Sequence, residues 1–173
     1  MKTQKIIYTV VFNLWICLVS GQIGIAKSTV NGNSTILDFN DVPGNTKGLI
    51  LPAVDSAPAG LNSSDNGTFV FDRSDAKIKM FENNAWRSLS DSGRSSSILS
   101  NASPETGTKI IVGSPTTNAS GIFVLESPDK AMILPQIANP HLFVKTPYPG
   151  MMCYDTVSKS LAVFDGAVWS YWK

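Results

Sequence analysis

Short apolar runs alternate with turn-forming residues along most of the chain. Residues 77–80 alternate polar and apolar side chains, which is the period-two pattern of a strand with one buried face. Turn-rich stretches flank this run at residues 72–75 and 82–84, and a further strand-like run begins at Trp86. No helical period occurs after the first twenty residues. The pattern therefore predicts an all-β fold made of meanders of short strands.

The same pattern occurs twice, 83 residues apart. Lys47-Gly-Leu-Ile-Leu-Pro52 aligns with Lys130-Ala-Met-Ile-Leu-Pro135, and the alignment continues without a gap to Ser88. The identical pairs further along are Gly67 with Gly150, Asp72 with Asp155, Phe81 with Phe164, and Trp86 with Trp169. Matches in this order indicate a duplication. We expect two homologous β-meander units, either packed together or intertwined in an oligomer.

The correspondence continues upstream at a different offset. Ile36-Leu37-Asp38 resembles Val124-Leu125-Glu126, 88 residues later, so the first copy has about five extra residues near positions 40–45. The Ser-rich composition between the copies is typical of a flexible tether or an exposed loop. The predicted boundaries are a signal peptide at 1–21, repeat unit 1 at 22–89, a linker at 90–107 and repeat unit 2 at 108–173.

The first residues have the pattern of a secretory signal. Lys2 and Lys5 precede an apolar run from Ile6 to Val19, and the small residues Ser20 and Gly21 follow it. The run is short for a membrane span, which needs about 20 apolar residues, and no later run is longer. We expect a cleaved signal, a mature chain without a membrane span, and a secreted or cell-surface location.

Composition excludes several classes of function. The net charge is +1 and only 16% of residues are charged, so no basic field is available to hold nucleic acid. After signal cleavage Cys153 is the single cysteine, and we expect a buried thiol without a disulfide. His141 is the only histidine, whereas zinc needs several His or Cys ligands, and no G-x-S-x-G elbow or comparable motif accompanies it for triad chemistry. We therefore expect no enzymatic activity, no cofactor and no metal site, although paired carboxylates for glycoside hydrolysis stay open.

The repeated aromatic residues are the candidates for binding. Trp86 and Trp169 are either platforms for sugar rings or core aromatics that close each meander, and we favour the core. Tyr171 and Trp172, at the C-terminus, are candidates for a contact between chains. The repeated Asp72 and its counterpart are better explained as turn residues than as calcium ligands.

The motifs resemble a family of short secreted proteins and fibre segments of Bacteroidetes bacteria. The matching stretches are Gln22-Ile-Gly-Ile25, Thr35-Ile-Leu-Asp38, the two Lys-to-Pro segments, Gly150-Met-Met-Cys-Tyr-Asp155 and Phe164-Asp-Gly166. Related stretches occur in phage-like tail-fibre and adhesin proteins, so the resemblance implies an exported, adhesive or fibre-like protein. Asp55-Ser-Ala57 and Asp155-Thr-Val157 also resemble the O-glycosylation pattern of exported proteins in these bacteria, with Ser56 and Thr156 as acceptors.

Together these patterns favour a non-catalytic structural or adhesive protein. It would act through β-rich contacts with other protein chains. We expect a homo-oligomer, and a trimer is one form that it could take. The alternative is a carbohydrate-binding module that uses Trp86 and Trp169 to bind a surface glycan.

Overall fold

The structure is a computed structural model that describes residues 21–98, 107 and 109–173. The predicted signal peptide lies outside these residues, except for Gly21, as does most of the second half of the linker. Among the described residues, no helix has both the length and the apolar character needed to cross a bilayer.

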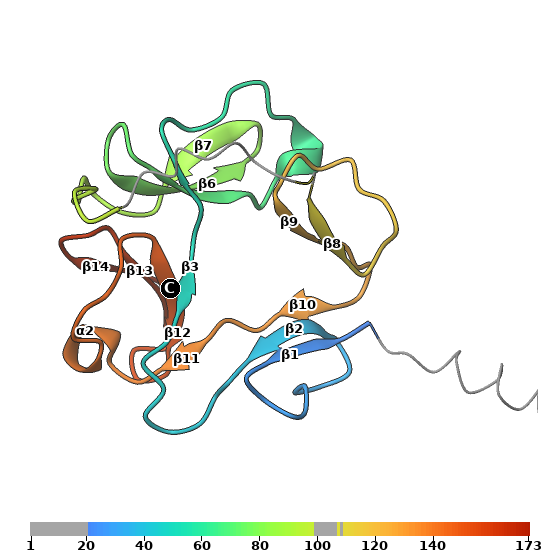
Figure 1. Cartoon of the computed structure of the whole chain (residues 1–173), viewed down its shortest axis with the longest axis horizontal. Helices are drawn as coiled ribbons and strands as arrows, with labels where there is room; N and C mark the ends of the chain where they lie inside the picture. The colour runs from blue at the N-terminus through green and yellow to red at the C-terminus, as the bar shows by residue number, and fades with distance from the viewer. Residues whose placement is uncertain (1–20, 99–106, 108) are drawn as a thin grey trace, which may run out of the picture.

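The prediction of an all-β fold is confirmed. The elements of the first unit are β1 Ile23–Ile25, β2 Thr35–Phe39, β3 Leu49–Ile50, β4 Ala53–Val54, the 3-10 helix η1 Ser63–Asp65, β5 Phe69–Asp72, β6 Lys77–Glu82 and β7 Ala85–Ser88. Those of the second unit are β8 Ile110–Val112, β9 Phe123–Leu125, β10 Ala131–Met132, β11 Gln136–Ile137, the short helix α2 Pro140–Phe143, β12 Met151–Asp155, β13 Ser160–Phe164 and β14 Trp169–Trp172. The strands form small sheets arranged around the middle of the molecule (Figure 1).

The two meanders have the same strand register. Strands β4, β5, β6 and β7 form one sheet in that order, and β11, β12, β13 and β14 follow the same order in another. Phe71 pairs with Ile78, and Tyr154 pairs with Leu161, at positions 83 residues later. The turns are of equal length in the two copies, and turn length sets hairpin register. The duplication read from the sequence is thus a duplication of the meander.

The start of each unit is a pair of parallel strands. Ile23 of β1 pairs with Leu37 of β2, and Val112 of β8 pairs with Leu125 of β9. The two pairs pack on each other, since Ile36, Leu37 and Val112 form one buried cluster.

The two meanders share one core. Its buried residues are Leu51, Phe71, Ile78 and Leu89 from unit 1, Ile98 from the linker, and Met152 and Val163 from unit 2. These residues come from the same face of each meander, so the units pack face to face. Burial of large apolar side chains is the main stabilising contribution to such an arrangement.

Of the two forms expected for the linker, a flexible tether or an exposed loop, its first part has the loop form, with most of residues 91–97 exposed and both ends of the stretch packed. Ser90 is buried and accepts a hydrogen bond from the backbone N–H of Ile78, 3.0 Å away. Gly93 donates its N–H to the carbonyl of Ala76, and Arg94 donates to the carbonyl of Asp165 in unit 2. Backbone hydrogen bonds to both units fix this segment, a feature that composition does not reveal.

Each Lys-to-Pro segment, residues 47–52 and 130–135, pairs with a strand of the other unit. Strand β3 of unit 1 pairs antiparallel with β12 of unit 2, whereas β10 of unit 2 pairs parallel with β2 of unit 1. The extra residues of the first copy take part, because Asn45 Nδ2 donates to the carbonyl of Gln136 over 3.1 Å. The units are therefore intertwined within a single chain.

Candidate interaction site

Trp86 and Trp169 lie on the outer faces of the meanders and are half-buried. Each packs on the phenylalanine opposite it in the neighbouring strand, with ring centroids 5.3 Å apart for Phe81 and 5.4 Å for Phe164. Trp86 also donates its Nε1–H to the carbonyl of Pro58. Trp169 contacts a buried cluster of Ile137, Met151, Cys153 and Ala162. Their geometry is that of partly covered packing residues.

We predict that replacing Trp169 with alanine costs more stability than replacing Trp86. A fully buried Trp contributes about 3–5 kcal/mol, so we expect a loss of about 2–4 kcal/mol for Trp169→Ala and about 1–2 kcal/mol for Trp86→Ala, which contacts less of the core. Denaturant unfolding measures both values. A glycan array on the same variants is the control: an unchanged unfolding midpoint with a lost glycan signal would contradict the packing role.

Tyr171 and Trp172 are exposed by 39% and 48%, but both have partners within the chain. The Tyr171 hydroxyl lies 2.9 Å from Nδ1 of His141. Trp172 donates its Nε1–H to the carbonyl of Leu89, which occupies the equivalent position of unit 1. Trp172 thus joins the last strand of unit 2 to the end of the meander in unit 1.

The repeated aspartates are buried and organise turns. Asp72 accepts hydrogen bonds from the N–H groups of Ala57 and Ser74 and from Lys79. Burial alone would raise the pKa of Asp72, but these donors outweigh it and hold the pKa well below the usual range. Asp155 likewise accepts hydrogen bonds from the N–H groups of Asn139 and Val157. Each aspartate ties its hairpin turn to the loop that follows β4 or β11.

Cys153 and His141, the cysteine and the histidine among the described residues, have different surroundings. Cys153 is fully buried, and this burial, with a smaller effect of the Asp155 charge, raises the thiol pKa to about 12. The thiol is therefore protonated at neutral pH. His141 faces Tyr171 in an edge-on contact. No group of three or more His, Cys, Asp or Glu side chains that could hold a metal ion occurs in the part of the chain that the structure describes.

Ser56 and Thr156, the candidate glycosylation acceptors, are both exposed. Ser56 follows β4, and Thr156 lies in the turn after β12, where its N–H donates to the carbonyl of Ile137. The two positions are not equivalent in the duplication, so a shared modification would have to arise independently in each unit.

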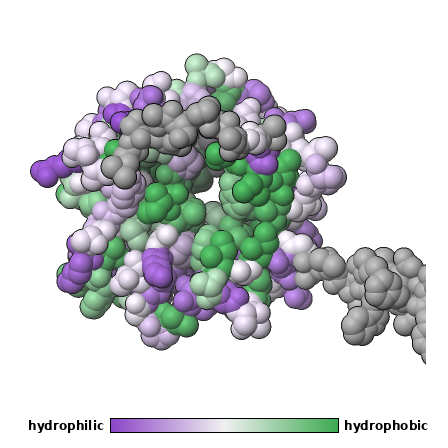
Figure 2. Space-filling model, in the orientation of Figure 1, coloured by the Kyte–Doolittle hydropathy of each residue, from purple (hydrophilic) through white to green (hydrophobic). Residues whose placement is uncertain are grey.

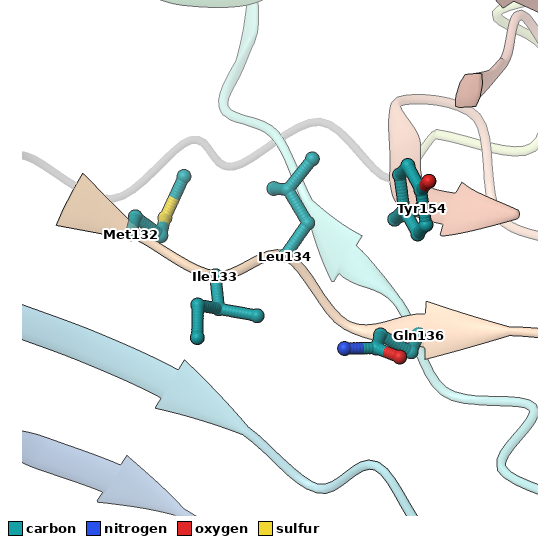
Figure 3. Close-up of a pocket in the computed structure, with 5 residues that line it drawn as sticks. All are labelled: Met132, Ile133, Leu134, Gln136 and Tyr154. Carbon is teal, nitrogen blue, oxygen red and sulfur yellow. The ribbon is translucent and has the colours of Figure 1, made fainter. Parts of the chain in front are cut away.

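An apolar cavity lies beside the second Lys-to-Pro segment. It has a volume of about 310 Å³, and its lining residues are Met132, Ile133, Leu134, Gln136 and Tyr154. Met132, Leu134 and Tyr154 point to one side of this segment, while Ile133 points to the other (Figure 3). Hydrophobic residues also gather around a hollow near the centre of the face that Figure 2 shows. Apolar side chains that border such a hollow leave apolar surface in contact with water.

The cavity marks a difference between the two units. Phe71 is fully buried, whereas Tyr154, at the equivalent position 83 residues later, is 36% exposed. Leu51 is likewise buried in the shared core, and its counterpart Leu134 is only partly buried. The core is therefore complete on the side of unit 1 and open on the side of unit 2.

A second apolar surface covers the start of the β8–β9 sheet. Ile110, Ile122 and Phe123 are exposed by 61%, 57% and 45%. They are neighbours, since Ile110 pairs with Phe123 and donates its N–H to the carbonyl of Ile122. We call these three residues the β8–β9 patch. Exposed hydrophobic residues that adjoin one another indicate an interaction surface more strongly than scattered ones do.

Sequence reasoning singled out the tryptophans and missed these surfaces. The alignment pairs Phe71 with Tyr154 and Leu51 with Leu134. Neither the alternation of polar and apolar residues nor the residue types indicate that the residues of unit 2 are open to solvent. Burial of a strand face depends on what packs over it, which is a tertiary property.

Comparisons with protein-family models, with curated proteins and with solved structures gave no match. Functional inference therefore rests on the residues and contacts of this chain.

Proposed function

We propose that this chain is a non-catalytic, secreted or cell-surface protein with a structural or adhesive role, and that it acts by contact with other protein chains. The observation that carries the proposal is the β8–β9 patch, where large exposed apolar residues adjoin one another at the start of two short paired strands. Covering such a patch with another protein removes apolar surface from water, which drives association. The signal-like N-terminus supports export.

The proposal includes self-association of the mature chain into a homo-oligomer. Strands of the two homologous units pair with each other within one chain. The same kinds of strand are present in a second copy, which supports pairing between copies. The carbohydrate-binding alternative has less support, because Trp86 and Trp169 are partly covered and pack on neighbouring rings.

Light scattering on the mature chain, residues 22–173, tests the proposal. We expect an oligomer for the wild type and a smaller species for Ile110→Lys, which places a charge in the β8–β9 patch. The matched control is Val42→Lys, since Val42 is also an exposed β-branched apolar residue, 54% exposed, on a loop outside this patch. A wild type that is monomeric from micromolar to near-millimolar concentration contradicts the proposal.

A further inference from the structure

Among the residues that the structure describes, the second unit has no strand at a position where the first unit has one. In unit 1, β2 lies between β1 and β10. Its counterpart β9 pairs only with β8 among the strands that the structure describes. The edge of β9 that corresponds to the β10 side of β2 is therefore without a described partner strand.

The hydrogen bonds show which groups lie on this edge. Ile122 and Glu126 bond to β8, through the Ile122 carbonyl and the Glu126 N–H, both over 2.9 Å. Because successive residues of a strand direct their N–H and C=O groups to opposite edges, Phe123 and Leu125 direct theirs away from β8. In β2, the carbonyl of Leu37 is the one that accepts from Ile133 of β10. Leu125 is the counterpart of Leu37 in both register and sequence.

The surroundings of this edge are apolar. Phe123 on β9 and Ile122 directly before this strand are exposed. Figure 1 places β9, β10 and β3 around the middle of the molecule, and Figure 2, in the same orientation, shows hydrophobic residues around a hollow near the centre of this face. A strand added to β9 would satisfy backbone groups and cover apolar side chains at once, the usual combination in β-strand addition.

We propose that the edge of β9 without a described partner strand, here called the free edge, accepts one extended strand of the Lys-x-x-Ile-Leu-Pro type from another chain that carries this repeat, in which this segment is not paired within its own chain. The argument for this occupant is the pairing of β2 with β10. There the same kind of segment fills the equivalent edge in the parallel direction, and Met132 packs against the buried cluster of Ile36, Leu37 and Val112. The inference rests on the proposed function, because it names the contact through which chains associate.

A synthetic peptide with the sequence of residues 128–137 tests the inference on the mature protein. Amide hydrogen exchange measured by NMR reports each backbone group separately. We expect saturating peptide to slow exchange at the amides of Phe123 and Leu125 by at least about tenfold, and to leave the already paired Val124 unchanged. If the protein is assembled, the same two amides are expected to be protected before peptide is added.

Two N-methylated peptides provide a matched control. In β10 the N–H groups of Ala131 and Ile133 donate to β2, so the N–H of Met132 points away. N-methylation at the Ile133 position is expected to weaken binding about tenfold, and at the Met132 position less than about twofold. As a variant of the protein, Phe123→Pro removes the N–H from the free edge, while Phe123→Ala keeps it. We expect the proline variant to lose binding and the alanine variant to keep it.

The outcomes separate the two proposals. Fast exchange at Phe123 and Leu125, both with peptide and in any assembled form, overturns the strand-acceptor inference. Equal effects of the two N-methyl groups would also overturn it, because they indicate apolar binding without strand pairing. An oligomer with freely exchanging β9 amides would support the proposed function and contradict this site. A monomer that binds the peptide at β9 would support this site and contradict the proposed function.

Discussion

Replacing Gly166 with alanine is expected to lower the free energy of unfolding by about 2–5 kcal/mol. Gly166 has a φ of +94°, where an L side chain is strained by about 1–2 kcal/mol. Its added Cβ would also lie 1.9 Å from the carbonyl oxygen of Arg94. Arg94 donates its N–H to the carbonyl of Asp165, so the linker cannot withdraw without losing this bond. Overpacking of a tight contact costs about a further 1–3 kcal/mol.

Two further variants separate strain from close contact. Gly67 has a φ of +89° but nothing within 4 Å of an added Cβ, so Gly67→Ala carries the strain alone. Gly93 is outside the positive-φ set, yet its added Cβ would lie 2.0 Å from the carbonyl oxygen of Asp165, so Gly93→Ala carries the contact alone. Denaturant unfolding should rank Gly166→Ala as the most destabilising. Equal losses for Gly166→Ala and Gly67→Ala would contradict the packing of the linker against unit 2.

Replacing Phe71 with alanine is expected to cost about 3–5 kcal/mol, because the ring is fully buried and its loss leaves a cavity in the shared core. The equivalent change Tyr154→Ala is expected to cost about 1–2 kcal/mol, since Tyr154 borders the open apolar cavity and is 36% exposed. Thermal or denaturant unfolding of the two variants makes the comparison at equivalent positions of one duplicated fold.

Tyr154→Phe is the control for the hydroxyl group. It keeps the ring, so we expect its stability to stay close to that of the wild type. If Tyr154→Ala were as destabilising as Phe71→Ala, the side chain of Tyr154 would be as well buried in solution as that of Phe71. The open cavity would then be ruled out.

Much of the fold could be predicted because its signals are local. The alternation at residues 77–80 and the turns on either side of it are properties of consecutive residues, and they fix a β-meander whatever packs on it. Asn83 and Asn84 both have positive φ, in the tight turn that the sequence placed there. The turn role of Asp72 could be predicted for the same reason, since its side chain bonds the N–H of Ser74, two residues on.

The candidate site could not be predicted, because it depends on which edges and faces find a partner. The two Lys-to-Pro segments have nearly the same residues, yet β3 runs antiparallel along β12 and β10 runs parallel to β2. The Ser-rich stretch 90–98 has the composition of a tether, yet Ile98 enters the core. A period of two specifies a strand and its apolar face, but it leaves open the neighbour across the edge, which the packing of distant segments decides.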